Sequence, residues 1–304
     1  MNISSLNQII YNYQNKTFYN GKINNLKQTN QIAFHGPLSK DIFLKNESKQ
    51  IRKDENPSDI FFTNMQNYGK NYEWANKMLK LSIDIASDIE QKKSFKEIIE
   101  KLQQGISSIY QNDSFGRYKH FPSEFYIIED EPKRGIEYLK RYLKKIDSTR
   151  TNCYSPESNS EYKNANTCRI VKYKKDNDAN AIIIEYGIFR DRLTNKPIGN
   201  MSSNLELAEK EYNKLLQIPK PSLKQINKSC AIIHWLIAQE SPWQRGSDSI
   251  ARLLTASIYS AYGIKIFPPK KGISFDFEAF YTNLNDYIKK YPYLFTKKPM
   301  KSKE

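Results

Sequence analysis

The sequence has few of the residues that cross-link small secreted proteins or hold metal ions. It contains three cysteines and three histidines in 304 residues, namely Cys153, Cys168, Cys230, His35, His120 and His234. Three cysteines are too few for a disulfide framework, and neither residue type shows metal-ligand spacing. Cys230 is expected in the core, whereas Cys153 and Cys168 could pair across a polar loop, with the reduced state as the default. We therefore expect no metal site and no cofactor.

Long hydrophobic runs are also missing. The run "AIIIEY" at 181–186 has the length of a strand and is far shorter than a transmembrane helix. The first residues lack the charged and then apolar pattern of a secretory signal. Residue 2 is asparagine, which excludes N-myristoylation of this sequence. The sequence therefore predicts neither a transmembrane segment nor an N-terminal lipid.

Acidic residues are scarce relative to basic ones. The chain has 48 Lys and Arg against 33 Asp and Glu, a net charge of +15. Such a charge favours acidic partners without specifying a fold. The abundance of Lys, Asn, Ile and Tyr is typical of a translated AT-rich genome, which accounts for the larger share of the excess. The aromatic residues form no interleaved stacking motif, so no nucleic-acid partner is expected.

The chain divides into a leader, a domain and a tail. Residues 1–55 are rich in Asn, Ser, Gln and Lys and are predicted to be a flexible leader. A secretion signal and a plain disordered segment fit this composition about equally. Residues 56–295 are predicted to form one domain, and residues 296–304 a frayed tail.

The predicted fold class is mainly α with a small β-hairpin element. Helical spacing of apolar residues indicates two helices within 71–111 and further helices at 131–147, 203–217, 222–239, 247–262 and 274–295. Strands are predicted at 168–175 and 180–190, with a hairpin or loop at 191–200. Ser94 and the pair Ser222 and Gln225 have the spacing of helix N-caps. Gly105 is expected to interrupt or end its helix, and Gly263 to end the helix at 247–262.

The turn at 240–246 carries the strongest candidate binding residues. A helix starting at Ser247 presents free amide groups at its positive end. Gly246 permits a close approach of the backbone to a ligand, and Arg245 has a planar guanidinium suited to phosphate. Arg252 follows on the same helix, so an anion or nucleotide site is possible. The same local sequence also fits an ordinary helix cap beside a solvated arginine. From the local sequence alone, this second interpretation is favoured over an anion site.

The order of elements around this turn resembles the motif of Fic proteins, H-P-F-x-(D/E)-G-N-G-R-x-x-R between two helices. Pro242, Trp243, Gly246 and Arg252 are in register with it, and Gly187 and Arg190 match the flap hairpin of that family. The departures are Ser241 at the catalytic histidine, Arg245 at the metal-binding acid, Asp248 at the second glycine and Ser249 at the first arginine. AMP transfer by a histidine base and a bound metal is therefore not expected.

The C-terminal third is similar to AvrB effectors, a branch of the Fic/Fido superfamily delivered by type III secretion. The matching features are His234 with Trp235, Pro242 with Gln244 to Ser247, Ala261 with Gly263 and Ile264, and Asp276 with Glu278 and Ala279. The similarity extends weakly to Asp191 and Arg192 in the hairpin, and residues 1–150 match only in helical character.

This resemblance implies a Fic/Fido-like helical core and an effector secreted into a host cell. The family glycosylates a host protein, transferring rhamnose from a nucleotide sugar to serine or threonine. Its functional arginine and aspartate correspond to Arg245 and Asp276, while a functional threonine of its N-terminal half has no counterpart that can be placed here. Nucleotide-binding positions implied beside Arg245 are Gly246, Ser247, Arg252, Arg190 and Arg192.

The implied roles are chemically sensible. Arg245 and the helix start at Ser247 would neutralise a diphosphate leaving group. Asp276 would bind sugar hydroxyls or accept the acceptor's proton. The hairpin near 187–195 is suited to holding an extended peptide by strand addition. The alternative is a module that binds a host protein or a nucleotide without turnover.

Overall fold

The computed structural model describes a little over half of the chain. The described residues are 57–61, 72–119, 123–128, 162, 168–174, 180–186, 189–190, 197–198, 201–270, 273–280 and 282–301. The leader expected at 1–55, the helix expected at 131–147 and Arg192 lie outside them. Contacts divide the chain into one unit of Met1–Lys53 with Asn67–Tyr72, and a second of Asp54–Gln66 with Glu73–Glu304. Apart from Tyr72, every described residue belongs to the second unit.

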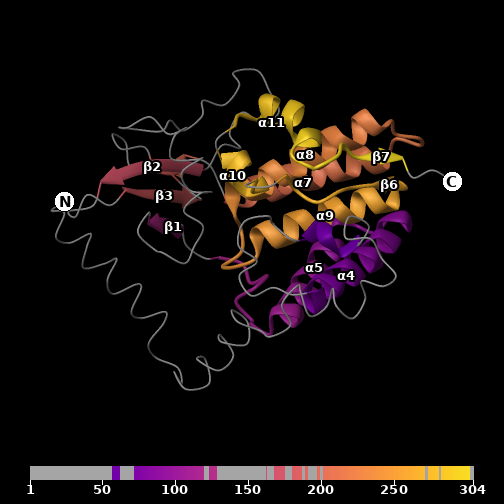
Figure 1. Ribbon diagram of the computed structural model, residues 1–304, viewed down its shortest axis with the longest axis horizontal. Coiled ribbons are helices and arrows are strands. Elements are labelled where there is room, and N and C mark those ends of the chain that lie inside the picture. The colour runs from indigo at the N-terminus through magenta and orange to yellow at the C-terminus, as the bar shows by residue number, and fades with distance from the viewer. Residues whose placement is uncertain are drawn as a thin grey trace. The chain divides into compact units, whose positions relative to one another are not determined.

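The described part is mainly helical, as the sequence predicted (Figure 1). Its α-helices are α4 (Tyr72–Glu90), α5 (Phe95–Tyr110), α7 (Met201–Leu216), α8 (Leu223–Glu240), α9 (Ser247–Ala261), α10 (Phe275–Phe280) and α11 (Leu284–Lys290). Two short 3₁₀ helices are η1 (Pro57–Phe61) and η2 (Tyr291–Tyr293). None of the described helices is long and apolar enough to span a bilayer.

The described residues also form three small antiparallel sheets. The first contains β1 (Ser123–Ile128), β2 (Cys168–Lys174) and β3 (Asn180–Tyr186) in the order β1-β3-β2. The β2–β3 hairpin was predicted from its two apolar runs and the turn between them, whereas β1 was not. The others pair β4 (Phe189–Arg190) with β5 (Pro197–Ile198), and β6 (Ile264–Lys265) with β7 (Met300–Lys301). The predicted second strand at 180–190 is therefore two strands, and the second of them begins a new hairpin.

Helix α8 is central to the helical core. It packs against α7, α9, α10 and α11, which explains why most of its residues are buried. Its start is fixed by a capping box, in which Ser222 Oγ accepts a hydrogen bond from the Gln225 amide and the Gln225 side chain accepts one from the Ser222 amide. The cap predicted at Ser222 is thus confirmed, because this short-range spacing alone determines where the helix begins.

Helix α5 corrects the expectation for Gly105. The helix begins at a capping box of Ser94 and Glu97 and continues through Gly105 to Tyr110. A Cβ atom added at Gly105 would lie 2.5 Å from Leu81 Cδ2 of α4. The glycine therefore permits close packing of two helices rather than ending one, since that packing offsets its low helix propensity.

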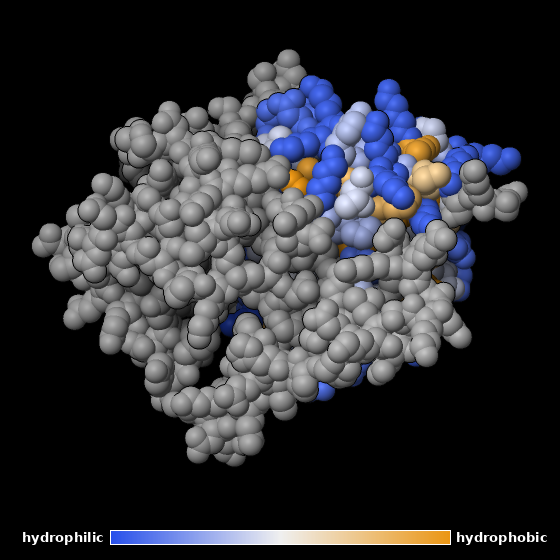
Figure 2. Space-filling model, in the orientation of Figure 1, coloured by the Kyte–Doolittle hydropathy of each residue, from blue (hydrophilic) through white to orange (hydrophobic). Residues whose placement is uncertain are grey.

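The C-terminal region corrects the single helix expected over 274–295. It forms α10, α11 and η2, and Asn283 starts α11 by accepting a hydrogen bond from the Asp286 amide at 2.9 Å. Beyond them, within the predicted tail, β7 pairs with β6. In Figure 2 hydrophilic residues are mixed with a few hydrophobic ones over the part where Figure 1 shows β6 and β7.

Candidate functional site

The turn between α8 and α9 is held by the segment that follows α5. The amide groups of Gln244 and Arg245 donate to the carbonyls of Arg117 and Ser114, at 2.8 and 3.2 Å. In return the Lys119 amide donates to the Pro242 carbonyl at 2.9 Å. These backbone bonds fix the turn independently of side chains and set the direction in which α9 starts.

Two residues in left-handed conformations shape this turn. Ser241 ends α8 with a φ of 44°, and Gly246 precedes α9 with a φ of 86°. A Cβ atom at Gly246 would also lie 3.0 Å from Phe115 Cδ1 and 3.3 Å from Ile106 Cγ2. Gly246 is therefore required by its backbone conformation and by the packing of α5 against the turn. Ser247 begins α9 as predicted, and its Oγ accepts hydrogen bonds from Ser241 Oγ and the Trp243 amide.

The predicted arginines lie in different environments. Arg245 is exposed, and no ion pair of its guanidinium occurs among the described residues. Arg252 is buried on α9, where it donates to the Ile60 carbonyl at 2.8 Å and lies 3.7 Å from Asp248 Oδ2. Arg190 is in β4 opposite Pro197. The geometry thus separates Arg252, which is engaged within the protein, from Arg245, which is free to meet a ligand.

Asp276 was predicted from the sequence to be catalytic, and it lies in the first turn of α10. The structure places its carboxylate within electrostatic reach of Arg252. Its Oδ1 accepts hydrogen bonds from Ser274 Oγ and from the Phe277 amide, the latter at 2.8 Å. Burial, followed by repulsion from the Asp248 carboxylate, raises the pKa of Asp276 to about 7. The two hydrogen bonds and the positive charge of Arg252 lower the pKa but do not offset these effects. Asp276 therefore has the pKa of an effective general base near neutral pH.

His234 completes what we term the carboxylate cluster: Asp248, Asp276, Arg252 and His234. The imidazole is fully buried on α8, and this burial lowers its pKa to about 4, so it is neutral at physiological pH. Tyr287 Oη donates to the Phe275 carbonyl at 3.2 Å and lies 3.0 Å from His234 Nδ1. Because the hydroxyl has only one proton, we assign the imidazole proton to Nδ1, which leaves Nε2 as an acceptor.

Two acceptors of the carboxylate cluster face each other. His234 Nε2 and Asp248 Oδ1 are 3.8 Å apart, and neither has a hydrogen-bond partner among the described residues. Buried polar atoms are nearly always hydrogen-bonded, so these two atoms indicate a position for a donor such as a hydroxyl group. No role for Asp248 was predicted from the sequence, and His234 was singled out only together with Trp235 as a matching pair. The one available signal was the four-residue spacing of Asp248 and Arg252 on a predicted helix.

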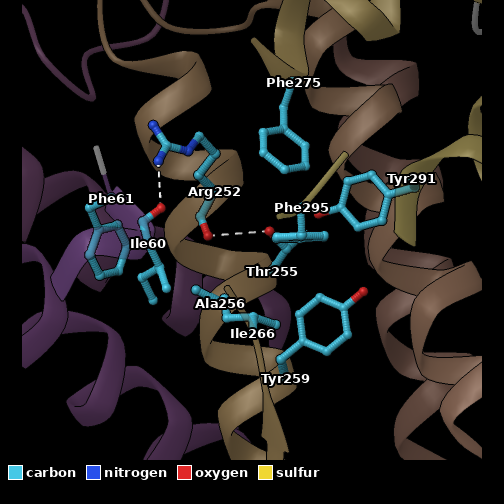
Figure 3. Close-up of a pocket in the computed structure, with 10 residues that line it drawn as sticks. All are labelled: Ile60, Phe61, Arg252, Thr255, Ala256, Tyr259, Ile266, Phe275, Tyr291 and Phe295. Atoms are coloured by element: carbon cyan, nitrogen blue, oxygen red, sulfur yellow. Dashed lines mark hydrogen bonds between the residues drawn. The ribbon is translucent and has the colours of Figure 1, made fainter. Parts of the chain in front are cut away.

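A narrow pocket adjoins Arg252 and is lined mainly by aromatic and apolar side chains (Figure 3). Its lining residues are Ile60, Phe61, Arg252, Thr255, Ala256, Tyr259, Ile266, Phe275, Tyr291 and Phe295. The cavity volume is about 20 Å³, which is sufficient for one water molecule. A nucleotide is much larger than this, so it would have to bind over the carboxylate cluster or by widening the pocket. Within the described residues no group of histidine, cysteine and carboxylate side chains has the arrangement of a metal site.

Comparison with known families bears on the region that contains the carboxylate cluster. The model of the AvrB_AvrC family, described as avirulence protein, matches residues 202–298, about a third of the chain. The match supports a relationship between this region and the AvrB-like family of avirulence effectors. The AvrB-like region runs from α7 through η2 and includes Arg245 and all four residues of the carboxylate cluster. No match was found among curated proteins.

Proposed function

We propose that the protein is an effector delivered into a host cell, where it transfers a sugar from a nucleotide sugar to a serine or threonine of a host protein. Two findings support this proposal. The family match supports an avirulence effector, and the carboxylate cluster lies within the matched region. The feature that carries the chemical part is the Asp276 carboxylate, which is held by Ser274 Oγ and the Phe277 amide, and whose pKa is raised to about 7 by burial and by Asp248. Delivery by type III secretion and a Fic/Fido fold belong to the same proposal.

The proposed step is a displacement at the anomeric carbon of the donor. The acceptor hydroxyl oxygen forms a bond to this carbon while the bond from the carbon to the diphosphate oxygen breaks. The nucleoside diphosphate leaves with the electron pair, and Asp276 takes the hydroxyl proton. A base whose pKa is close to the working pH is the most effective one for this transfer. The facing acceptors of His234 and Asp248 would bind hydroxyl groups of the sugar or the acceptor.

The leaving diphosphate requires positive charge outside the buried cluster. Arg245 is exposed at the turn, and α9 begins two residues later with Ser247 after Gly246. A guanidinium and a helix N-terminus both stabilise negative charge that develops on a phosphate. Asp248 in the first turn of α9 partly opposes this effect, so Arg245 has the larger role in the proposal. Arg252 would act on the charges of Asp248 and Asp276, and Arg190 and Arg192 would approach the donor from the hairpin.

A second candidate function is stoichiometric binding of a host protein without turnover. The observation that favours it is the small pocket volume of about 20 Å³ beside Arg252. A preformed donor site would be several times larger. In addition, Arg245 occupies the position of the metal-binding acid of Fic proteins, so AMP transfer of the Fic type is not a third candidate function.

The proposed function is tested by intact-mass analysis of host proteins incubated with the full chain and individual nucleotide sugars. Donors are selected first by the rise in melting temperature that each produces. We expect one donor to stabilise the wild type but not Arg245→Ala, and to yield a protein adduct with the mass of one sugar. Asp276→Asn should bind the donor but form the adduct at least ~100-fold more slowly, because the proton acceptor is lost.

The matched control is Asp84→Asn, which removes an exposed carboxylate from α4. It should leave both donor binding and adduct formation unchanged. If no donor shifts the melting temperature and host proteins are captured without any change in mass, the binding function replaces the transferase.

A further inference from the structure

A basic ribbon lies on the surface at the C-terminal end of the described chain. It consists of residues 264–270 and 293–301. These two segments contain five lysines and no aspartate or glutamate. The basic ribbon therefore carries five unopposed positive charges in its own sequence, part of the net charge of +15.

Backbone hydrogen bonds hold the two halves of the basic ribbon side by side. Ile264 and Lys265 pair with Lys301 and Met300 in the β6–β7 sheet. Further along, the Lys270 amide donates to the Leu294 carbonyl, and the Thr296 amide to the Pro268 carbonyl, both at 2.8 Å. Lysines that are about 30 positions apart in the sequence are thereby brought onto one surface.

The lysines of the basic ribbon are available to a partner. The exposed ones are Lys265, Lys270, Lys297, Lys298 and Lys301, and none of them forms an ion pair with a described residue. Lys265 Nζ and Lys297 Nζ each lie 5.6 Å from the centre of the Phe267 ring, and Lys298 Nζ lies 4.1 Å from that of Tyr293. These cation–π contacts position the ammonium groups without neutralising them.

Exposed apolar side chains accompany this charge. Tyr293 is 53% exposed and Met300 is 43% exposed, and they are two of the four large hydrophobic residues that are exposed in the described part of the chain. Figure 2 shows a few hydrophobic residues among hydrophilic ones in the part where Figure 1 places β6 and β7. Lysines around a tyrosine and an unbranched apolar side chain form a surface that suits the boundary between lipid headgroups and acyl chains.

We infer that the basic ribbon docks the protein onto a bilayer surface rich in anionic phospholipid. The lysines meet the negative headgroups, while Tyr293 and Met300 enter the headgroup layer. Nucleic acid fits less well, since binding of single strands requires free aromatic faces. Here Lys298 lies over the Tyr293 ring, and Lys265 and Lys297 lie over the Phe267 ring. This inference is independent of the proposed transferase activity.

The test is co-sedimentation of the full chain with vesicles of phosphatidylcholine, with and without phosphatidylserine. We expect binding only to vesicles that contain phosphatidylserine, and weaker binding as salt is raised. The double variant Lys297→Gln with Lys298→Gln should bind roughly 25-fold more weakly, because each lysine near an anionic surface contributes about a five-fold factor. The control variant Lys77→Gln with Lys80→Gln removes two exposed lysines from α4 and should change binding less than roughly two-fold.

A third variant distinguishes a membrane from a soluble polyanion. Met300→Ser keeps every lysine, so it should weaken vesicle binding several-fold and leave binding to a mixed-sequence oligonucleotide unchanged. The inference would be overturned if the control variant lost as much vesicle binding as the Lys297 and Lys298 double variant. Binding of the wild type to vesicles without phosphatidylserine would also overturn it. Tighter binding to the oligonucleotide than to vesicles at the same salt would also overturn it. All substituted side chains are exposed, and unchanged melting temperatures would verify that the variants fold.

Discussion

His234 on α8 and Asp248 on α9 face each other across 3.8 Å with two hydrogen-bond acceptors, His234 Nε2 and Asp248 Oδ1, that have no partner in the described part of the chain. The two residues are separated by the turn that contains Ser241 and Gly246, whose left-handed conformations determine how α9 returns toward α8. The repulsion between the two acceptors would be removed by a proton on His234 Nε2 or by a hydrogen-bond donor bound between them. Because the low pKa of His234 keeps it neutral, it forms no ion pair with Asp248, and the space between these two acceptors is suited to binding a hydroxyl group.

The low pKa of His234 predicts a loss of stability in acid. The folded state has a pKa of about 4 for this residue against an ordinary value of 6.5, so between these values the unfolded state binds more protons. The contribution of His234 to stability should therefore be present above pH 6.5 and should decline as the pH falls toward 4. Urea unfolding of the wild type and of His234→Asn would measure this difference. The variant should be less stable by ~2 kcal/mol at neutral pH, because it leaves a small cavity. A difference between the two proteins that is constant from pH 7 to 4 would contradict the assignment.

Asp276 predicts the pH profile of the proposed transfer reaction. A base with a pKa of about 7 is active only when it is deprotonated, so kcat/KM should rise through pH 7 and then level off. Initial rates of adduct formation measured from pH 5 to 9 would give this profile. The residual activity of Asp276→Asn should be independent of pH over the same range. A wild-type profile that is flat through pH 7 would remove Asp276 from the role of base.

Glu240 at the end of α8 predicts a pH effect on stability in the opposite direction to that of His234. Burial raises its pKa to about 8, although its Oε2 accepts a hydrogen bond from the Leu205 amide at 3.1 Å. In the unfolded state Glu240 has its ordinary pKa of 4.5, so between pH 4.5 and 8 the folded state binds a proton that the unfolded state has lost. The free energy of unfolding should therefore fall as the pH rises from 4.5 to 8. The glutamine side chain of Glu240→Gln does not titrate. The free energy of unfolding of this variant should therefore rise relative to that of the wild type by ~2 kcal/mol or more across this pH range. Parallel curves of unfolding free energy against pH for the two proteins would refute the prediction.

Gly246 and Gly263 allow a matched test of packing at the turn. Both have positive φ, 86° and 63°, but only Gly246 has neighbours where a Cβ atom would lie. Gly263→Ala should cost ~1 kcal/mol from backbone conformation alone. Gly246→Ala should cost ~2–3 kcal/mol, because the methyl group also displaces Phe115. Chemical unfolding measures both values, and equal losses would mean that the contact with Phe115 relaxes freely.

Sequence patterns predicted those parts of the fold that depend on neighbouring residues. The apolar spacing of α8 and the capping box at Ser222 are short-range features, and both were confirmed. Gly105 was misjudged because its close partner, Leu81, lies on another helix, and contact between helices overrides local propensity. The single helix expected over 274–295 was wrong because Asn283 starts a new helix within it.

The candidate site shows the same division between local and distant information. Arg252 and Asp276 were each singled out from the sequence, and the structure brings them within electrostatic reach of each other. The relationship between His234 and Asp248 was not predicted. It depends on the path of the turn, which is fixed by hydrogen bonds to residues 114–119, more than a hundred positions earlier.

The hydrogen bond from Arg252 to the Ile60 carbonyl joins residues 192 positions apart. The AvrB_AvrC family model matches from residue 202, yet the arginine of the carboxylate cluster is held by a segment that precedes α4. The recognisable region and the folding unit therefore have different boundaries. A recombinant fragment that begins at α7 would lose the partner of this guanidinium and the wall of the pocket formed by Ile60 and Phe61. Its behaviour would report on an incomplete site rather than on the protein.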